Sequence, residues 1–120
     1  MREILFRGKS KTTGEWFYGN LFDKDISGRT HITTTSIGCL NIDPETVGQF
    51  TGITDRDGAK IFEDDIFKIG AEEGIFTVKF DYGCFLAYDG NGEQVGILSE
   101  LSTMFVKVIG NIHDNKELLS

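Results

Sequence analysis

Short apolar runs separated by turn residues recur along the whole chain. The alternation is clearest over residues 75–82, IFTVKFDY, where Phe76, Val78, Phe80 and Tyr82 share one face and the intervening residues share the other. A period of two predicts β-strands, and runs spaced about every 8–12 residues predict an all-β sandwich or small barrel. The predicted strands are residues 2–8, 16–22, 31–35, 39–42, 47–53, 59–63, 66–69, 75–82, 84–88, 95–98 and 104–112.

Turn signals divide these runs. The strongest are DRDG at 55–58 and DGNG at 89–92, because Gly and Asn tolerate positive φ angles. Other turns are predicted at 9–15, in the polar loop 23–30 and at Glu72-Glu73-Gly74.

Helical signals are few. Asp43 followed by Pro44 predicts a capped helical turn, since Asp favours the N-cap and Pro the first helical position. Short turns are also expected at 99–103, capped by Ser99, and at 115–119. The fold is therefore mainly β with one or two short helical turns.

The chain of 120 residues predicts one domain, residues 1–120, with possible sub-lobes at 1–45 and 46–120. Hydrophobic residues make up 39% of the chain and aromatic residues 12%, which is too apolar for a disordered protein.

The net charge of −7 disfavours direct binding to nucleic acid, because phosphate backbones repel an acidic protein. A basic patch at Arg2, Arg7, Lys9 and Lys11 is the exception, and solvation of an early hairpin explains it as well. The acidic balance instead favours a protein partner or solubility alone.

Several features indicate a cytoplasmic protein. Cys39 and Cys84 lie in apolar surroundings without metal-ligand spacing, which predicts buried free thiols. The N-terminal residues lack a signal-peptide core, and no segment approaches the length of a membrane span.

The segment TGITDRDGAKIFEDDIFKIG, residues 51–70, carries five acidic side chains and resembles the start of a calcium loop. An EF-hand loop places Gly at its sixth position and Glu at its twelfth. Counting from Asp55, the fourth position is Gly58 and the twelfth is Ile66, so the pattern indicates a tight turn and not a calcium site.

The run Glu63-Asp64-Asp65 raises the possibility of catalytic carboxylates, alone or with a divalent metal. Adjacent side chains of a strand point to opposite faces, so at most two of the three converge. The structural alternative is a polar turn between two strands, in which one carboxylate accepts hydrogen bonds from backbone N–H groups.

No other catalytic pattern emerges. His31 and His113 are the only histidines, and neither a dinucleotide-binding nor a phosphate-binding loop occurs. We therefore expect no enzymatic activity, no metal and no cofactor. The aromatic stretch Trp16-Phe17-Tyr18 suits either core packing or stacking on a base or peptide.

Three blocks of the chain resemble the YopX-like family. They are MREILFRGKSKTTGEWFYGNL, IDPETVGQFTGITDRDGAKIFEDDIFKI and VKVIGNIHDNKELL, in the family's order and spacing. One departure is Asp64, where the family usually has Gly; Asp tolerates the left-handed conformation better than most residues. The residues that carry the resemblance are Trp16, Tyr18, Gly52, Asp55, Gly58, Glu63, Asp65, Gly110 and Asn111.

The resemblance implies a phage or prophage protein of a bacterial host, with an SH3-like barrel, homo-oligomers and no established activity. It also favours a structural role for Asp65. We therefore expect a non-enzymatic protein that acts through self-association and contacts with bacterial or phage proteins. The alternative is a nucleic-acid-associated accessory protein of phage replication or regulation.

Overall fold

The computed structural model describes residues 4–19, 21–24, 30–34, 38–71, 74–101 and 103–119. Side chains are described throughout these ranges except at 21–24, 30–34, 38–40 and 103. Most of the predicted loop 23–30, namely residues 25–29, and Glu72 and Glu73 of a predicted turn lie outside the description. The chain divides into two compact units, residues 1–50 and 51–120.

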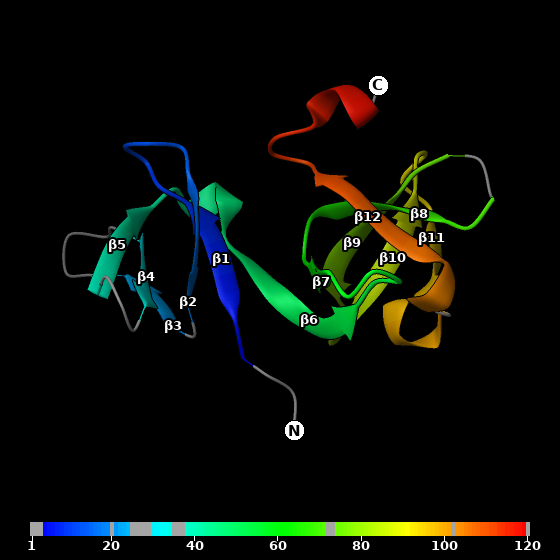
Figure 1. The fold of residues 1–120 in the computed structure, drawn as a ribbon, viewed down its shortest axis with the longest axis horizontal. Helices are drawn as coiled ribbons and strands as arrows, with labels where there is room; N and C mark the ends of the chain where they lie inside the picture. The colour runs from blue at the N-terminus through cyan, green and yellow to red at the C-terminus, as the bar shows by residue number, and fades with distance from the viewer. Residues whose placement is uncertain are drawn as a thin grey trace. The chain divides into compact units, whose positions relative to one another are not determined.

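Unit 1 is built from antiparallel hairpins (Figure 1). Its elements are β1 (Phe6–Lys9), β2 (Trp16–Gly19), β3 (Leu21–Lys24), β4 (Thr30–Thr34), β5 (Gly38–Ile42) and the 3-10 turn η1 (Pro44–Thr46). The strands β1 and β2 form the predicted first hairpin, and β3, β4 and β5 pair in chain order. Asp43 caps η1 as predicted, because its Oδ1 accepts a hydrogen bond from Glu45 N at 3.1 Å.

The strand β6 (Gly48–Thr54), green in Figure 1, carries the chain from unit 1 into unit 2. Its first residues pair with β1, and β7 is its neighbour in the same sheet. In unit 2 the hydroxyl of Thr51 donates to the carbonyl of Ile61 at 2.8 Å, which ties β6 to β7.

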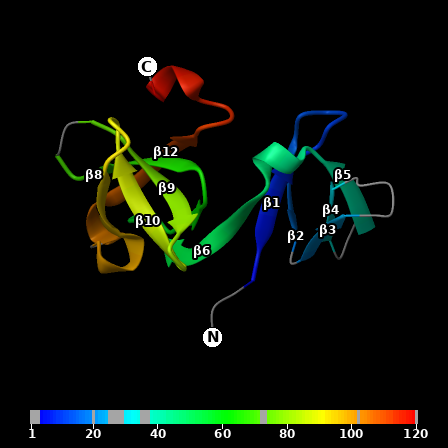
Figure 2. The same ribbon diagram turned by 180° about the vertical axis from the view of Figure 1, so that it is seen from behind.

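Unit 2 holds a five-stranded antiparallel sheet in the order β11-β10-β9-β8-β12. The strands β9 and β10 lie side by side in its centre, as Figure 2 shows from behind. The elements of unit 2 are β7 (Lys60–Phe62), β8 (Asp65–Ile69), β9 (Phe76–Asp81), β10 (Cys84–Asp89), β11 (Gln94–Ile97), η2 (Leu98–Glu100), η3 (Thr103–Phe105), β12 (Val106–Asn111) and η4 (Lys116–Leu119).

The core of unit 2 follows the predicted alternation. Phe76 and Val78 of β9 are buried and pack with Phe67, whose ring lies 5.7 Å from that of Phe76. Burying side chains of this size contributes about 1.5–3 kcal/mol each. The alternation fails toward the end of β9, where Phe80 is 50% exposed and Tyr82 is 86% exposed.

The all-β class is confirmed, but the expected barrel does not close within the described residues. The sheet of unit 2 has two edges, β11 and β12. The backbone of β12 instead bonds to the turn after β6: Arg56 N donates to Val106 O at 2.9 Å, and Val108 N donates to a carboxylate oxygen of Asp55 at 3.0 Å. A turn therefore satisfies groups that a closing strand would pair in a barrel.

The predicted helical turns are found as short 3-10 segments. The terminal turn is η4, and the turn expected at 99–103 begins earlier, at Leu98. Its N-cap is Ile97 and not Ser99, and no side chain caps it.

Candidate functional site

The DRDG segment forms a tight turn organised by Asp55. The Oδ1 atom of Asp55 accepts hydrogen bonds from Asp57 N and Ala59 N, both at 2.9 Å. Gly58 has φ +84°, the left-handed conformation that the sequence predicted for this turn. Because Oδ2 accepts from Val108 N at 3.0 Å, the buried carboxylate also joins the turn to β12.

These contacts explain the acidity of Asp55. Burial raises the pKa of the Asp55 carboxyl, because a buried charge loses its hydration. Hydrogen bonds from Val108, Ala59 and Asp57 outweigh that effect, and the Lys107 ammonium lowers the pKa further. The pKa therefore lies below its ordinary value of 3.8. The carboxylate is held ionised by backbone donors, an arrangement typical of a structural role.

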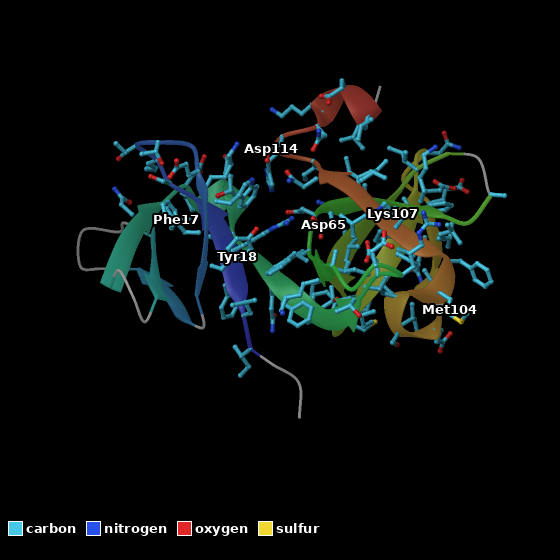
Figure 3. The ribbon with its side chains drawn as sticks, in the orientation of Figure 1. Phe17, Tyr18, Asp65, Met104, Lys107 and Asp114 are labelled. Carbon is cyan, nitrogen blue, oxygen red and sulfur yellow. The ribbon has the colours of Figure 1, made fainter. Side chains whose placement is uncertain are left out.

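The acidic corner, residues Glu63 to Asp65, turns the chain from β7 into β8. Asp64 adopts φ +73° at the position where the resemblance placed Gly. Asp65 is 2% exposed, and its Oδ2 accepts a hydrogen bond from Phe62 N at 2.7 Å (Figure 3). The polar-turn interpretation therefore accounts for Asp65, and we infer that its carboxylate stabilises this bend.

The carboxylate of Asp64 lies between the side chains of a lysine and a histidine that are distant from it in the sequence. Lys79 Nζ lies 2.6 Å from Oδ1, and His113 Nε2 lies 3.4 Å from Oδ2. The backbone of Asp64 adds two hydrogen bonds, from its N to Val78 O at 2.8 Å and from Ile112 N to its O at 3.0 Å. Asp64 is thus a junction between β9 and the end of β12.

The segment after β12 completes this junction. Asn111 lies opposite Asp65 in the β8–β12 register, and its Oδ1 accepts from His113 N and Asp114 N. Asn115 Oδ1 accepts from Asn111 N at 3.1 Å. A Cβ atom on Gly110 would lie 2.4 Å from that same oxygen, so only glycine fits there without rearrangement.

The remaining signature residues lie on strands. Gly52 has φ +86° in β6. In unit 1, Trp16 packs beneath cations, with the Arg7 guanidinium 4.7 Å and Lys9 Nζ 5.7 Å from its ring. Phe17 and Tyr18 extend to opposite sides of β2 (Figure 3), and Tyr18 is 48% exposed. Arg7 thus covers a face of the indole that base stacking would use.

No arrangement suited to holding a metal ion occurs among the described His, Cys, Asp and Glu side chains. Cys84 is free and half-buried, where a buried thiol was expected. The side chains of Cys39 and His31 lie outside the description.

A hollow with a volume of about 400 Å³, here called the β9–β10 hollow, lies on β9 and β10. Strand alternation brings its side chains together: Thr77, Lys79 and Asp81 alternate along β9, and Tyr88 lies directly opposite Thr77. The lining residues are Thr77, Lys79, Phe80, Asp81, Tyr88 and Gly92.

The chemistry of this hollow combines a ring and a carboxylate. Desolvation raises the pKa of the Tyr88 phenol above its ordinary value of 10, and the nearby Asp81 carboxylate raises it further. None of these residues is predicted as a site from the sequence, although the alternation of 75–82 places Thr77, Lys79 and Asp81 on one face. The alternation alone does not show which residue of β10 lies opposite these side chains, so Tyr88 could not be predicted as part of the hollow.

Fold and site together define a small all-β protein. The carboxylates of Asp55 and Asp65 accept hydrogen bonds from the backbone of turns, and a hollow lies on the sheet of unit 2. The family model for the YopX protein matches residues 5–120, so the chain belongs to the YopX family, as the resemblance indicated. No curated protein matches the chain. In the described residues, no helix is long and apolar enough to cross a membrane.

Proposed function

We propose that this YopX family member is a non-enzymatic phage or prophage protein that acts through self-association and protein–protein contacts in the cytoplasm of a bacterial host. Family membership supports a phage-type protein whose biochemical activity is not established. The structural role that we infer for Asp55 and Asp65, two of the five acidic side chains in residues 51–70, supports a non-enzymatic protein.

The observation that carries the proposal is the exposure of large apolar side chains in unit 2. Met104 is 75% exposed, and its neighbour Phe105 is 56% exposed. The backbone at this position is fixed, because Gly70 N donates to Phe105 O at 2.7 Å. Neighbouring exposed apolar residues on a fixed backbone are typical of a contact surface, since their burial against a partner is favourable. Met104 is labelled in Figure 3.

Light scattering coupled to size-exclusion chromatography over a range of protein concentrations tests self-association. We expect the parent protein to form a homo-oligomer and the double variant Met104→Ser, Phe105→Ser to shift toward the monomer. Leu119→Ser is the matched control, because Leu119 is 45% exposed and lies away from this pair in the sequence.

A parent protein that stays monomeric at every concentration, and that captures no partner from host lysate, contradicts the proposal. An equal shift toward the monomer in Leu119→Ser would mean that the interface is not at Met104 and Phe105.

The same samples are then mixed with a single-stranded oligonucleotide at about 50 mM salt, where electrostatic binding is strongest. A mobility shift that Trp16→Ala abolishes would favour the nucleic-acid alternative, although Arg7 already covers the Trp16 ring.

A further inference from the structure

The β9–β10 hollow has an unbalanced negative charge. Lys79 lines it, but the Lys79 ammonium lies 2.6 Å from Asp64 Oδ1, and the Asp64 carboxylate balances its positive charge. Within the described residues, no lysine, arginine or histidine forms an ion pair with Asp81. The Asp81 carboxylate accepts one hydrogen bond, from Tyr82 N at 3.0 Å, and keeps capacity for a cationic donor.

The ring of Tyr88 supplies a second element of cation recognition. Tyr88 of β10 lies opposite Thr77, which is four residues from Asp81 along β9 and on the same face, and both Tyr88 and Asp81 line the hollow. An aromatic ring attracts a cation through its negative face, and a carboxylate forms charge-assisted hydrogen bonds with guanidinium or ammonium groups. The two groups together match the end of an arginine or lysine side chain.

Backbone strain beside the hollow points the same way. Tyr82 and Gly83 form the β9–β10 turn with φ +51° and +79°. Turns of this geometry favour Asn or Gly at the first position, and an aromatic residue with positive φ is strained. Tyr82 is nevertheless 86% exposed, so its ring gains little from packing within the chain. A strained and exposed aromatic residue is typical of a contact site.

We propose that the β9–β10 hollow binds an arginine or lysine side chain from a basic segment of a partner protein. The cation lies against the ring of Tyr88 and pairs with the Asp81 carboxylate, and Tyr82 is exposed in the turn that follows Asp81. The net charge of −7 attracts such a segment over a longer range. This inference rests on the proposed function, because it names the chemistry of one protein contact.

A fluorescent peptide of alternating arginine and glycine is the probe, and fluorescence anisotropy at about 50 mM salt measures its binding. We expect Asp81→Asn and Tyr88→Leu each to weaken binding about fivefold to tenfold, and Tyr88→Phe to retain it because the ring remains. Glu100→Gln is the matched control, since Glu100 is exposed and its substitution removes the same charge outside the hollow.

Equal weakening by Glu100→Gln and Asp81→Asn would overturn the proposal, because it would indicate general attraction to an acidic surface. Unchanged binding in Asp81→Asn, or no binding in the parent, would overturn it as well. So would binding of free arginine methyl ester without binding of the peptide, which would indicate a small-molecule site.

Light scattering on the same samples separates this inference from self-association. An oligomeric Asp81→Asn variant that has lost peptide binding supports the hollow as a distinct site. A monomeric parent that binds the peptide in an Asp81-dependent way leaves the hollow in place while contradicting self-association.

Discussion

Two hairpin turns in unit 2 share the pattern Asp-x-x-Gly and nearly identical local geometry. Oδ1 of the first residue, Asp55 or Asp89, accepts backbone N–H groups two and four residues later, at 2.9–3.0 Å. The glycines have φ +84° and +82°, and each donates its N–H to the carbonyl of the Asp three residues earlier, Asp55 or Asp89, at 3.0 Å. The same four-residue chemistry therefore builds the same turn twice.

The two turns differ in what lies beyond them. Asp55 is 6% exposed, and its second carboxylate oxygen accepts Val108 N from β12. Lys107 of β12 also pairs with Asp57 at 2.5 Å (Figure 3). Asp89 is half-buried, and its hydrogen bonds to Asn91, Gly92 and Glu93 stay within its own hairpin. A turn motif thus specifies local geometry, whereas contacts with another strand decide whether the turn also stabilises the tertiary fold.

The largest expected effect comes from exchanging each aspartate for asparagine. In Asp55→Asn the amide oxygen can keep the turn bonds, but the amide N–H₂ then faces Val108 N–H, so one partly buried donor loses its partner. We expect a loss of about 2–3 kcal/mol in the free energy of unfolding, against less than about 1 kcal/mol for Asp89→Asn. Urea denaturation measures both. Equal losses would show that the contact with β12 contributes little.

Much of this fold followed from local sequence. The alternation of Phe76 and Val78, the D-x-x-G turns and the Asp43–Pro44 cap are encoded by neighbouring residues, and the structure has each of them. The left-handed Asp64 was expected from the resemblance and is also found.

What the sequence did not predict depends on distant partners. The bond from Val108 to Asp55 joins residues 53 positions apart, and it lets a turn, in place of a closing strand, cover part of the edge of β12. The exposure of Phe80 and the β9–β10 hollow depend on how strands end and pair, which a period of two does not encode. Residue pattern therefore predicted elements and turns, and tertiary contacts placed the candidate site.

The stability of the two turns should also differ in its dependence on pH. Because the pKa of folded Asp55 lies below its ordinary value of 3.8, the unfolded chain binds a proton there more readily than the folded chain. Its stabilising contribution is thus fully present above the unfolded pKa and is lost as the pH falls through the folded pKa. We expect the stability difference between the parent and Asp55→Asn to shrink between about pH 5 and pH 2.

Urea denaturation at each pH checks this expectation. Asp89→Asn is the control, since its contacts lie in an exposed hairpin and its stability difference should change less over the same range. If the difference in the free energy of unfolding between the parent and Asp55→Asn stayed constant with pH, the charge of the Asp55 carboxylate would not contribute to stability.

The smallest effect tests the feature that the two turns share. A Cβ atom added at Gly58 or Gly92 meets no other atom within 4 Å, so Gly→Ala at either position introduces backbone strain without a clash. A left-handed alanine costs roughly 1–2 kcal/mol, and the alanine's smaller entropy in the unfolded chain offsets part of that cost. We expect Gly58→Ala and Gly92→Ala to lose the same amount, about 1 kcal/mol. Thermal and urea unfolding compare them directly. A clearly larger loss at Gly58 would mean that strain in the turn spreads through Asp55 into β12, so that local and tertiary contributions are coupled and not additive.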